Sequence, residues 1–256
     1  MDRCFYCETI PPAGDTVILS EIESQHLQSS LRLRGETEIH LLNGAGQSAA
    51  AAATPAAAGR RRGLVHCRII EHQHHPEPVV KLILFVVPPR AKAMARIIRQ
   101  ATELGVWEIH SVIARRSVRL PAATVVDGWN VHVREAAKQS GNPFFPTIHT
   151  PIDLTELAPT VAIPCHYGAA PGSRVVGSSA DTPRRRHVFP AERIKASGGR
   201  VGLWIGPEGG FDVDETAAVQ ASGALPLVVG CWTLRVETAV VAGLSRLTTM
   251  YRGMVE

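Results

Sequence analysis

The stretch VVKLILFVV at residues 79–87 most constrains what this chain can fold into. It is almost entirely apolar, which is typical of a strand that is covered on both faces. The next segment, AKAMARIIRQATELGV, has apolar residues at helical spacing and ends at Gly105, a suitable C-cap. A doubly covered strand followed by an amphipathic helix predicts a sheet packed between helices. The expected buried face of that helix consists of Met94, Ile97, Ile98, Ala101 and Leu104.

Strand and helix patterns keep alternating to the end of the chain. This alternation is typical of an α/β domain with a mainly parallel sheet. The segment 168–190 is rich in Gly, Ser, Pro and Arg, so we expect a mobile loop there. The further expected strands are 107–114, 161–166, 200–205 and 225–229, and the further expected helices are 127–140, 190–197, 212–222 and 236–251.

The first 76 residues have a different pattern. Short β-branched stretches at 16–20, 37–42 and 63–70 are separated by Gly, Pro and Ser, which predicts a small β-barrel. The segment 24–35 between two of them predicts one helical turn. We interpret the alanine-rich segment 49–62 as a flexible surface insertion, because its Pro and Gly break any alanine helix. The predicted domains are therefore 1–76 and 77–256.

Composition and charge exclude several classes of protein. Lys and Arg (27) only slightly outnumber Asp and Glu (23), so the placement of basic residues matters more than their sum. The N-terminal MDRCFYCETIPPAG lacks the apolar core of a signal peptide, and no run approaches the roughly 18 apolar residues of a membrane helix. We expect a cytoplasmic protein without a membrane partner; import into an organelle stays open.

The cysteines predict neither disulfides nor a metal. Five scattered cysteines argue against a disulfide framework and suit a reducing compartment. Cys4 and Cys7 form a C-x-x-C, but a zinc site would need two more ligands, for which His72, His74 and His75 are the candidates. Since no second C-x-x-C follows, we predict an N-terminal strand there and no metal.

The stretch LWIGPEGGF at 203–211 predicts a ligand-facing turn. Ligands bind at the carboxyl ends of parallel strands, and glycines let a ligand approach the backbone closely. Asp212 with Glu215 three residues later has the pattern of a helix capping box. The loop matches neither a P-loop nor G-x-G-x-x-G. A second strand is expected to end at Gly230, 24 residues after Gly206, and we expect both exits to share one pocket.

Several motifs, in this order and spacing, resemble one family. They are ATELGV (101–106), RRSVRL (115–120), EAAKQS (135–140), IGPEGGF (205–211) and LRVETA (234–239), and HLQSSLRLRG (26–35) with IHLLNGAG (39–46) resembles the same family's PUA-like barrel. The family is the ribosomal RNA small-subunit methyltransferases E (RsmE), of the SPOUT class. The resemblance implies a deep trefoil knot, S-adenosylmethionine as methyl donor, and homodimers. It implies N3-methylation of a uridine in 16S-type ribosomal RNA or in a 30S-type particle.

The resemblance also implies roles for individual residues. An arginine can stabilise negative charge that develops on uracil without acting as a base, which makes Arg235 the first catalytic candidate. Glu237 is the second, as base or as the residue that orients Arg235; the alternative is a first-turn carboxylate of the last helix. His166 is more simply interpreted as structural. The residues expected to bind the methyl donor are Leu203, Ile205, Gly206, Pro207, Glu208, Gly209, Gly210, Val229, Gly230, Trp232 and Leu234.

Clustered basic residues predict contact with RNA phosphates. Aromatic residues make up 5% of the chain, so we expect specificity to come from RNA shape and one flipped uracil instead of broad stacking surfaces. The residues expected to contact RNA are Arg32, Arg34, Arg90, Lys92, Arg96, Arg99, Arg115, Arg116 and Arg119.

Three departures from the family pattern leave alternatives open. Asn142 stands where the family usually has an arginine, CHYGAAPG (165–172) replaces the usual first cofactor loop, and the alanine-rich insertion is unusual for the family. The alternatives are a SPOUT enzyme that acts on another RNA such as tRNA, and a non-catalytic RNA-binding protein of ribosome assembly with a vestigial knot.

Overall fold

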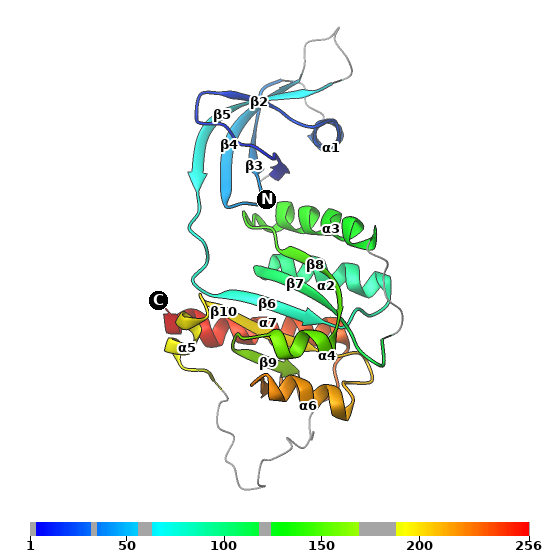
Figure 1. Ribbon diagram of the computed structural model, residues 1–256. Coiled ribbons are helices and arrows are strands. Elements are labelled where there is room, and N and C mark those ends of the chain that lie inside the picture. The colour runs from blue at the N-terminus through cyan, green and yellow to red at the C-terminus, as the bar shows by residue number, and fades with distance from the viewer. Residues whose placement is uncertain (1–3, 32–34, 56–62, 118–123, 169–187, 256) are drawn as a thin grey trace. The chain divides into compact units, whose positions relative to one another are not determined.

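The computed structural model describes residues 4–31, 35–55, 63–117, 124–168 and 188–255. The chain divides into two compact units, described separately below (Figure 1). The N-terminal unit comprises Met1–Glu77 with Arg134–Phe145, and the C-terminal unit comprises Pro78–Val133 with Pro146–Glu256. Arg32, Arg34, Arg119, residues 56–62 and most of the loop expected at 168–190 lie outside the described residues.

The N-terminal unit is built on a five-stranded sheet in the order β1-β3-β4-β5-β2. Only β1 and β3 pair in parallel; the other neighbours are antiparallel. The predicted single helical turn is instead a helix of 11 residues, α1. The elements are β1 (Cys4–Tyr6), β2 (Thr16–Ile18), α1 (Glu21–Leu31), β3 (Thr37–Leu42), β4 (Gln47–Pro55) and β5 (Val65–His74).

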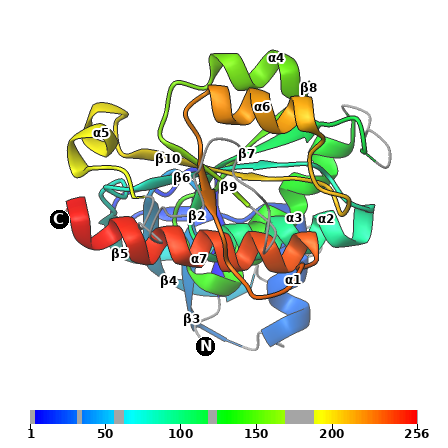
Figure 2. The ribbon, with the colours of Figure 1, turned by 90° about the horizontal axis from the view of Figure 1, so that it is seen from below.

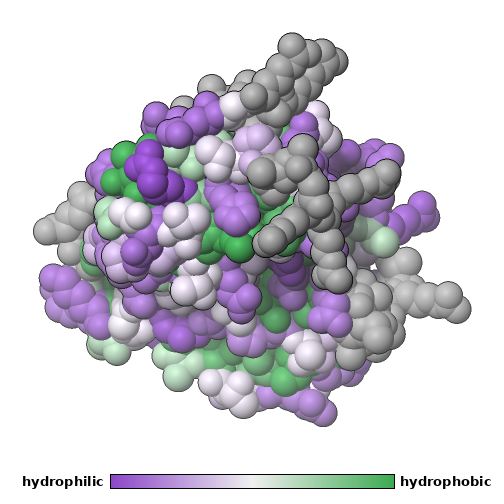
Figure 3. Space-filling view, turned by 90° about the horizontal axis from the view of Figure 1, so that it is seen from above, coloured by the Kyte–Doolittle hydropathy of each residue, from purple (hydrophilic) through white to green (hydrophobic). Residues whose placement is uncertain are grey.

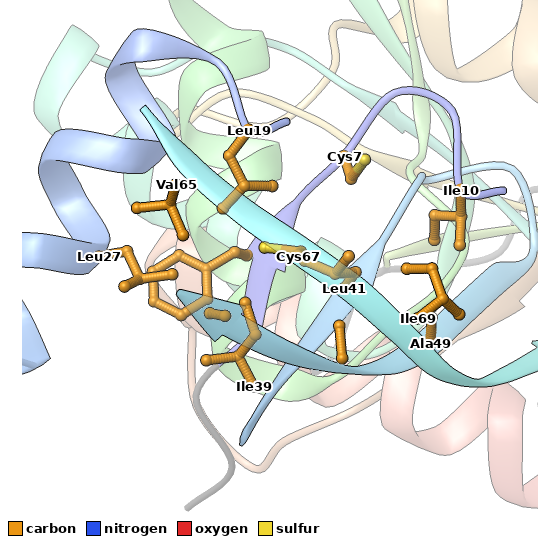
Figure 4. Close-up of a cluster of buried hydrophobic side chains, with 13 residues drawn as sticks. Cys7, Ile10, Leu19, Leu27, Ile39, Leu41, Ala49, Val65, Cys67 and Ile69 are labelled. Atoms are coloured by element: carbon orange, nitrogen blue, oxygen red, sulfur yellow. The ribbon is translucent and has the colours of Figure 1, made fainter. Parts of the chain in front are cut away.

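The alanine-rich segment is not a surface insertion where the structure describes it. Residues 49–55 belong to β4, which pairs with β3 on one side and β5 on the other. Ala49, Ala51 and Ala53 are buried in the core of the unit, where Figure 4 shows Ala49 beside Ile69. Alanine has a low strand propensity, but two hydrogen-bonded neighbours and a buried face override it. The flexible-insertion interpretation is therefore wrong for 49–55.

Residues 134–145 join the N-terminal unit through charge and backbone contacts. Lys138 donates to Glu23 Oε1 at 2.8 Å, and both side chains are about nine-tenths buried. The Phe145 amide donates to the Gly44 carbonyl at 2.9 Å. A side chain at Gly44 would overlap the Phe145 ring, so the NGAG turn needs glycine here. These contacts explain why a segment distant in sequence packs on the β-sheet.

The C-terminal unit is an α/β structure with a six-stranded sheet in the order β11-β9-β10-β6-β7-β8. Every neighbouring pair is parallel, which confirms the predicted fold class. The trefoil knot stays a prediction. The elements are β6 (Lys81–Val86), α2 (Ala91–Glu103), β7 (Val106–Ile113), α3 (Thr124–Ser140, shared with the N-terminal unit), β8 (Thr147–Asp153), α4 (Leu154–Leu157), η1 (Ala158–Thr160), β9 (Cys165–Gly168), α5 (Ala191–Ala196), β10 (Arg200–Ile205), α6 (Val213–Ala221), β11 (Leu225–Leu227) and α7 (Val236–Val255).

Helices cover both faces of this sheet, as the apolar stretch at 79–87 predicts. Figure 2 shows α4 and α6 on one side and α2 and α7 on the other. The predicted face of α2 is buried except for Leu104, which is the half-exposed C-cap, and Thr102 is buried as well.

The face of the molecule in Figure 3 has hydrophilic side chains interspersed with smaller apolar areas. Among the described residues, no helix is both long and apolar enough to cross a membrane.

A row of stacked rings runs across four strands on the face covered by α4 and α6. Trp204 of β10 stacks on Phe85 of β6 with ring centroids 4.2 Å apart, Phe85 on His110 of β7 at 4.9 Å, and His110 on His149 of β8 at 3.9 Å. The strand registers align these residues side by side. The row therefore connects a central tryptophan, through Phe85 and His110, to His149 of the edge strand β8.

The buried carboxylate of Glu108 lies at the histidine end of this row and contacts His110 and Arg200. His110 Nε2 lies 3.0 Å from Glu108 Oε2, and Arg200 Nη2 lies 2.7 Å from Glu108 Oε1. Burial lowers the pKa of His110 below its ordinary value of 6.5, although the hydrogen bond to Glu108 opposes this shift. Burial therefore favours the neutral imidazole of His110 in the folded protein.

We predict that His110 makes the protein acid-sensitive. The unfolded chain binds this proton more readily than the folded protein, so the free energy of unfolding falls as the pH drops below about 6.5. His110→Gln keeps an N–H for Glu108 but does not titrate, so its stability should fall less between pH 7.5 and 5.5. Urea denaturation at both pH values measures the difference. An equal loss in the two proteins would contradict the prediction.

Candidate functional site

A pocket of about 320 Å³ lies at the carboxyl ends of three neighbouring strands of the C-terminal unit. The loops that leave β10 and β11 form its walls, and Gly168 at the end of β9 lies between them. β10 and β11 are not neighbours, because β9 separates them. The lining residues are Gly168, Ile205, Gly206, Pro207, Glu208, Gly209, Gly210, Phe211, Val229, Gly230, Trp232, Thr233, Leu234, Val236 and Ala239.

The first loop turns sharply because of its glycines. Gly210 has a φ of 71°, and its amide donates to the Pro207 carbonyl at 2.8 Å. A Cβ on Gly206 would lie 3.2 Å from the Phe211 amide nitrogen, so a larger residue would push the two sides of the loop apart. The loop thus brings its backbone close to the pocket, and glycine is what allows it.

The predicted capping box ends this loop and begins α6. Asp212 Oδ1 accepts from the Glu215 amide, Glu215 Oε2 accepts from the Asp212 amide, and each distance is 2.8 Å. The amide of Glu215 is the main cause that lowers the pKa of the Asp212 carboxyl. Both carboxylates also complement the positive end of the helix dipole. The end of the loop is therefore fixed by backbone-directed hydrogen bonds.

Two arginines that leave β7 brace the same loop. The Arg115 amide donates to buried Glu215 at 2.6 Å, and its guanidinium lies 3.0 Å from Asp212 and 2.9 Å from Asp214. Arg116 Nη1 donates to the Gly209 carbonyl. We predicted both arginines as RNA contacts, but the structure directs their side chains to the loop and to the first turn of α6.

The second loop, 228–235, is held open by a leucine. The Leu234 side chain would touch a Cβ on Gly230 at 3.3 Å, so it fills the inside of the loop. Arg246 of α7 donates to the Val228 carbonyl and braces the loop from the helix side. Trp232 lies on the rim of the pocket with 81% of its surface exposed. The loop therefore directs one apolar residue inward and one outward.

The structure brings together all predicted donor-binding residues except Leu203. Leu203 is fully buried, and its side chain packs where a Cβ on Gly243 of α7 would lie. It packs between β10 and α7 and does not line the pocket. The list of expected donor-binding residues lacks Gly168 at the end of β9, Phe211 and Thr233 in the two loops, and Val236 with Ala239 in α7. The last two are three residues apart on one helical face, a signal that could have found them.

The two predicted catalytic residues lie beside the pocket but not among the residues that line it. Arg235 is exposed at the end of the second loop. Glu237 is half-buried in the first turn of α7, and its Oε1 lies 3.7 Å from Arg96 Nη1 of α2. The ion pair that the described residues show for Glu237 is therefore with α2 and not with Arg235.

The basic residues of α2 are exposed, as expected for nucleic-acid contacts. Arg90 and Lys92 lie at its start, Arg96 pairs with Glu237, and Arg99 Nη2 lies 3.0 Å from His132 Nδ1. The N-cap Arg90 and the three cations of α2 together form a positive surface.

His166 is structural, as interpreted from the sequence. It is fully buried in β9, and its Nε2 lies 2.7 Å from the Tyr251 hydroxyl of α7. The same hydroxyl accepts from the Phe189 amide at 3.1 Å. These hydrogen bonds tie the end of α7 to the sheet strand that leads to the pocket.

One group of side chains has a composition that a metal ion could bind. Glu108, His110 and His149 place ligand atoms within 4.8 Å of one another. However, the two imidazole rings stack with only 8° between their planes. A metal lies in the plane of each imidazole that binds it, and two stacked parallel planes do not meet. The group is therefore a hydrogen-bonded cluster in this geometry.

The Cys7 side chain of the predicted C-x-x-C is a buried thiol that donates a hydrogen bond to the Thr9 carbonyl. Burial raises the pKa of this thiol.

We predict that Arg116 limits the motion of the first loop. Arg116→Ala removes the donor to the Gly209 carbonyl, so amide hydrogen exchange in residues 206–211 should accelerate while the sheet stays protected. Arg90→Ala is the matched control, because Arg90 is exposed and its side chain makes no capping bond to α2. Unchanged exchange in the Arg116 variant would mean that the capping box alone holds the loop.

Comparisons with known proteins agree with one another. A family model described as RNA methyltransferase domain matches residues 75–248. The chain is similar to ribosomal RNA small subunit methyltransferase E of Aquifex aeolicus, with 30% identity over 72% of this chain and 75% of that protein. It is also similar to the protein of that name from Synechocystis, with 26% identity over 92% of this chain and 73% of that protein.

A solved structure shares the fold. The crystal structure of a ribosomal RNA small subunit methyltransferase E from Neisseria gonorrhoeae, bound to S-adenosyl methionine, matches with a TM-score of 0.79 and 22% identity. The match covers 98% of each chain, so it includes both units. This likeness supports the predicted fold class over the whole length.

Proposed function

The chain belongs to the RNA methyltransferase family that includes ribosomal RNA small subunit methyltransferase E, and from this premise we propose that it transfers a methyl group from S-adenosylmethionine to N3 of a uridine in small-subunit ribosomal RNA. One observation carries the proposal: two glycine-containing strand exits, 24 residues apart in the chain, surround one pocket. A pocket at the carboxyl ends of parallel strands is the expected ligand position in such a sheet.

The residues of the pocket fit the methyl donor. Ile205, Val229 and Leu234 offer apolar walls for an adenine ring, and the glycine loops offer backbone groups for its edges and for the ribose. Glu208 is the one ionisable side chain among the lining residues, and it is exposed. We assign it to the ribose hydroxyls or to the attraction of the positive sulfonium. The volume of about 320 Å³ lies within the ordinary range for ligand pockets.

The chemistry needs orientation and charge stabilisation from the protein. The bound donor supplies an electrophilic methyl group, so the chain has to align uridine N3 with it. Arg235 is exposed directly beside the pocket, and we assign it to the negative charge that develops on the uracil as its N3 proton leaves. Glu237 is held by Arg96, which suits a proton acceptor at a fixed position better than a residue that orients Arg235.

The exposed cations of α2 form the best-supported RNA-binding surface of the C-terminal unit. We further propose that the protein acts as a cytoplasmic homodimer and that a PUA-like domain over residues 1–76, which makes up most of the N-terminal unit, contributes to RNA binding. Arg115 forms an ion pair with Asp212, and Arg116 donates a hydrogen bond to the first loop, so we assign both arginines to holding the pocket loop and not to binding RNA.

The decisive experiment combines cofactor binding with mapping of the product. Isothermal titration with S-adenosylmethionine should show saturable binding to the full chain. Mass spectrometry of small-subunit RNA should then detect an N3-methyluridine that depends on the protein. Absence of donor binding would favour a non-catalytic RNA-binding protein. Methylation of tRNA instead of ribosomal RNA would favour the other enzyme class.

We predict that Arg235→Ala abolishes turnover while the affinity for S-adenosylmethionine stays within about tenfold, a change of about 1.4 kcal/mol. The guanidinium lies outside the pocket lining, so its loss should affect the developing charge more than the bound donor. Lys195→Ala, an exposed cation on α5, is the control. Single-turnover methylation and titration calorimetry measure the two quantities. Normal turnover in the Arg235 variant would remove this residue from the mechanism.

We predict that Arg90→Ala combined with Lys92→Ala weakens RNA binding and flattens its salt dependence. Each lost phosphate contact should lower the slope of log K against log salt by roughly 0.7–0.9. These two cations are the cleaner targets in α2, because Arg96 and Arg99 also contact Glu237 and His132. Filter binding at several salt concentrations provides the slope. An unchanged slope would show that this end of α2 does not reach RNA.

A further inference from the structure

Trp232 combines two properties that no other tryptophan of the chain has. It lines the pocket, and 81% of its surface is exposed. Trp129 and Trp204 are buried, and Trp107 is half-buried beneath Lys81. Burial of a large aromatic side chain is worth roughly 2–3 kcal/mol, which a surface tryptophan forgoes. An aromatic ring kept at the mouth of a pocket is therefore available to a ligand.

The loop is built to keep this ring outside. Leu234 occupies the inside of the loop against Gly230, and Arg246 holds the backbone at Val228. The side chain inside the loop is thus Leu234 and not Trp232. Trp232 thus lines the pocket and exposes most of its surface to solvent.

The surroundings of the ring favour a nucleic acid base over a protein surface. Its neighbours Thr233 and Arg235 are exposed, polar or charged. The centre of an interface between two protein chains is typically depleted in charge and continuous in apolar area. A lone aromatic ring with a nearby cation is the combination that binds single-stranded nucleic acid, where bases stack on the ring and arginine meets the backbone or the base edge.

We propose that Trp232 is the stacking platform for the extruded uracil, and that it binds the substrate base and not the methyl donor. This inference rests on the proposed function and deepens it. The donor fills the pocket behind the ring, and the flipped base lies on the exposed face. Stacking restricts the base to one plane, and Arg235, three residues later, then meets the edge where negative charge develops. Trp232 is in this respect a specificity residue for an unpaired pyrimidine.

Two variants and one control test this role. Trp232→Ala should raise KM for small-subunit RNA roughly tenfold or more, because base–aromatic stacking is worth about 1–3 kcal/mol per base. Trp232→Phe keeps a ring and should recover most of the loss. Neither variant should change the affinity for S-adenosylmethionine by calorimetry. Val213→Ala removes another strongly exposed apolar side chain outside the pocket lining, and it should leave KM unchanged.

Quenching of tryptophan fluorescence gives a second, independent measurement. Acrylamide should quench Trp232 preferentially in the free protein, because the other tryptophans are less exposed. A uridine-containing RNA oligonucleotide should protect it in the presence of S-adenosylmethionine, and this protection should be absent in Trp232→Phe. Protection by the donor alone, together with a loss of donor affinity in Trp232→Ala, would make Trp232 a wall of the donor site and overturn the inference.

Two further outcomes would also overturn it. A lower molecular mass of Trp232→Ala in light scattering would place the ring between two copies of the chain. Wild-type KM in Trp232→Ala would show that the ring does not meet the RNA. In both cases the wild-type protein still methylates RNA, so the proposed function stands. A wild-type protein that neither binds S-adenosylmethionine nor methylates RNA would overturn the proposed function and this inference together.

Discussion

The pocket depends on one buried carboxylate. Glu215, in the first turn of α6, is 2% exposed and accepts two backbone hydrogen bonds, from Asp212 and from Arg115. The first bond ends the glycine loop that follows β10, and the second ties this loop to the exit of β7, a hundred residues earlier. A buried carboxylate without such donors would lower the stability of the fold. The two segments are therefore fixed at the positions from which their amides can donate to Glu215. Glycine residues allow a loop many backbone conformations, and the hydrogen bonds to Glu215 restrict this loop to one of them.

The same logic explains which cations of the chain remain available to a partner. Arg115 and Arg116 extend from the loop after β7, as phosphate-binding arginines would, yet their donors go to Asp212, Asp214 and Gly209. Exposed ion pairs contribute little stability on their own, with about 0–1 kcal/mol as the usual range. Their effect here is geometric: together with the capping box they fix the direction of the loop. The cations of α2, which have fewer partners inside the fold, are correspondingly better placed to meet RNA.

Much of this architecture could be predicted from local pattern. The apolar stretch 79–87 and the helix after it predict a covered parallel strand, and the capping box is readable from Asp212 and Glu215 alone. The features that escaped prediction depend on partners distant in sequence. Alanines become a central strand only when two neighbours pair with them, and β8 is an edge strand whose residues lack a clear alternation. Likewise, the sequence does not show that Arg116 reaches Gly209 or that Leu203 packs against Gly243 of α7, because both facts depend on tertiary contacts.

The two ends of the parallel sheet differ in how far their charged and aromatic side chains are exposed. At the amino-terminal end, Glu108 is buried and compensated by His110 and Arg200, so its charge is used within the fold. At the carboxyl end, Glu208, Arg235 and Trp232 are exposed around a pocket, and each forgoes interactions that burial would provide. Groups that stabilise a fold are expected to be matched, whereas groups that meet a ligand must stay unmatched until it binds. This contrast supports the proposal that the unit binds its ligand at the carboxyl ends of its strands.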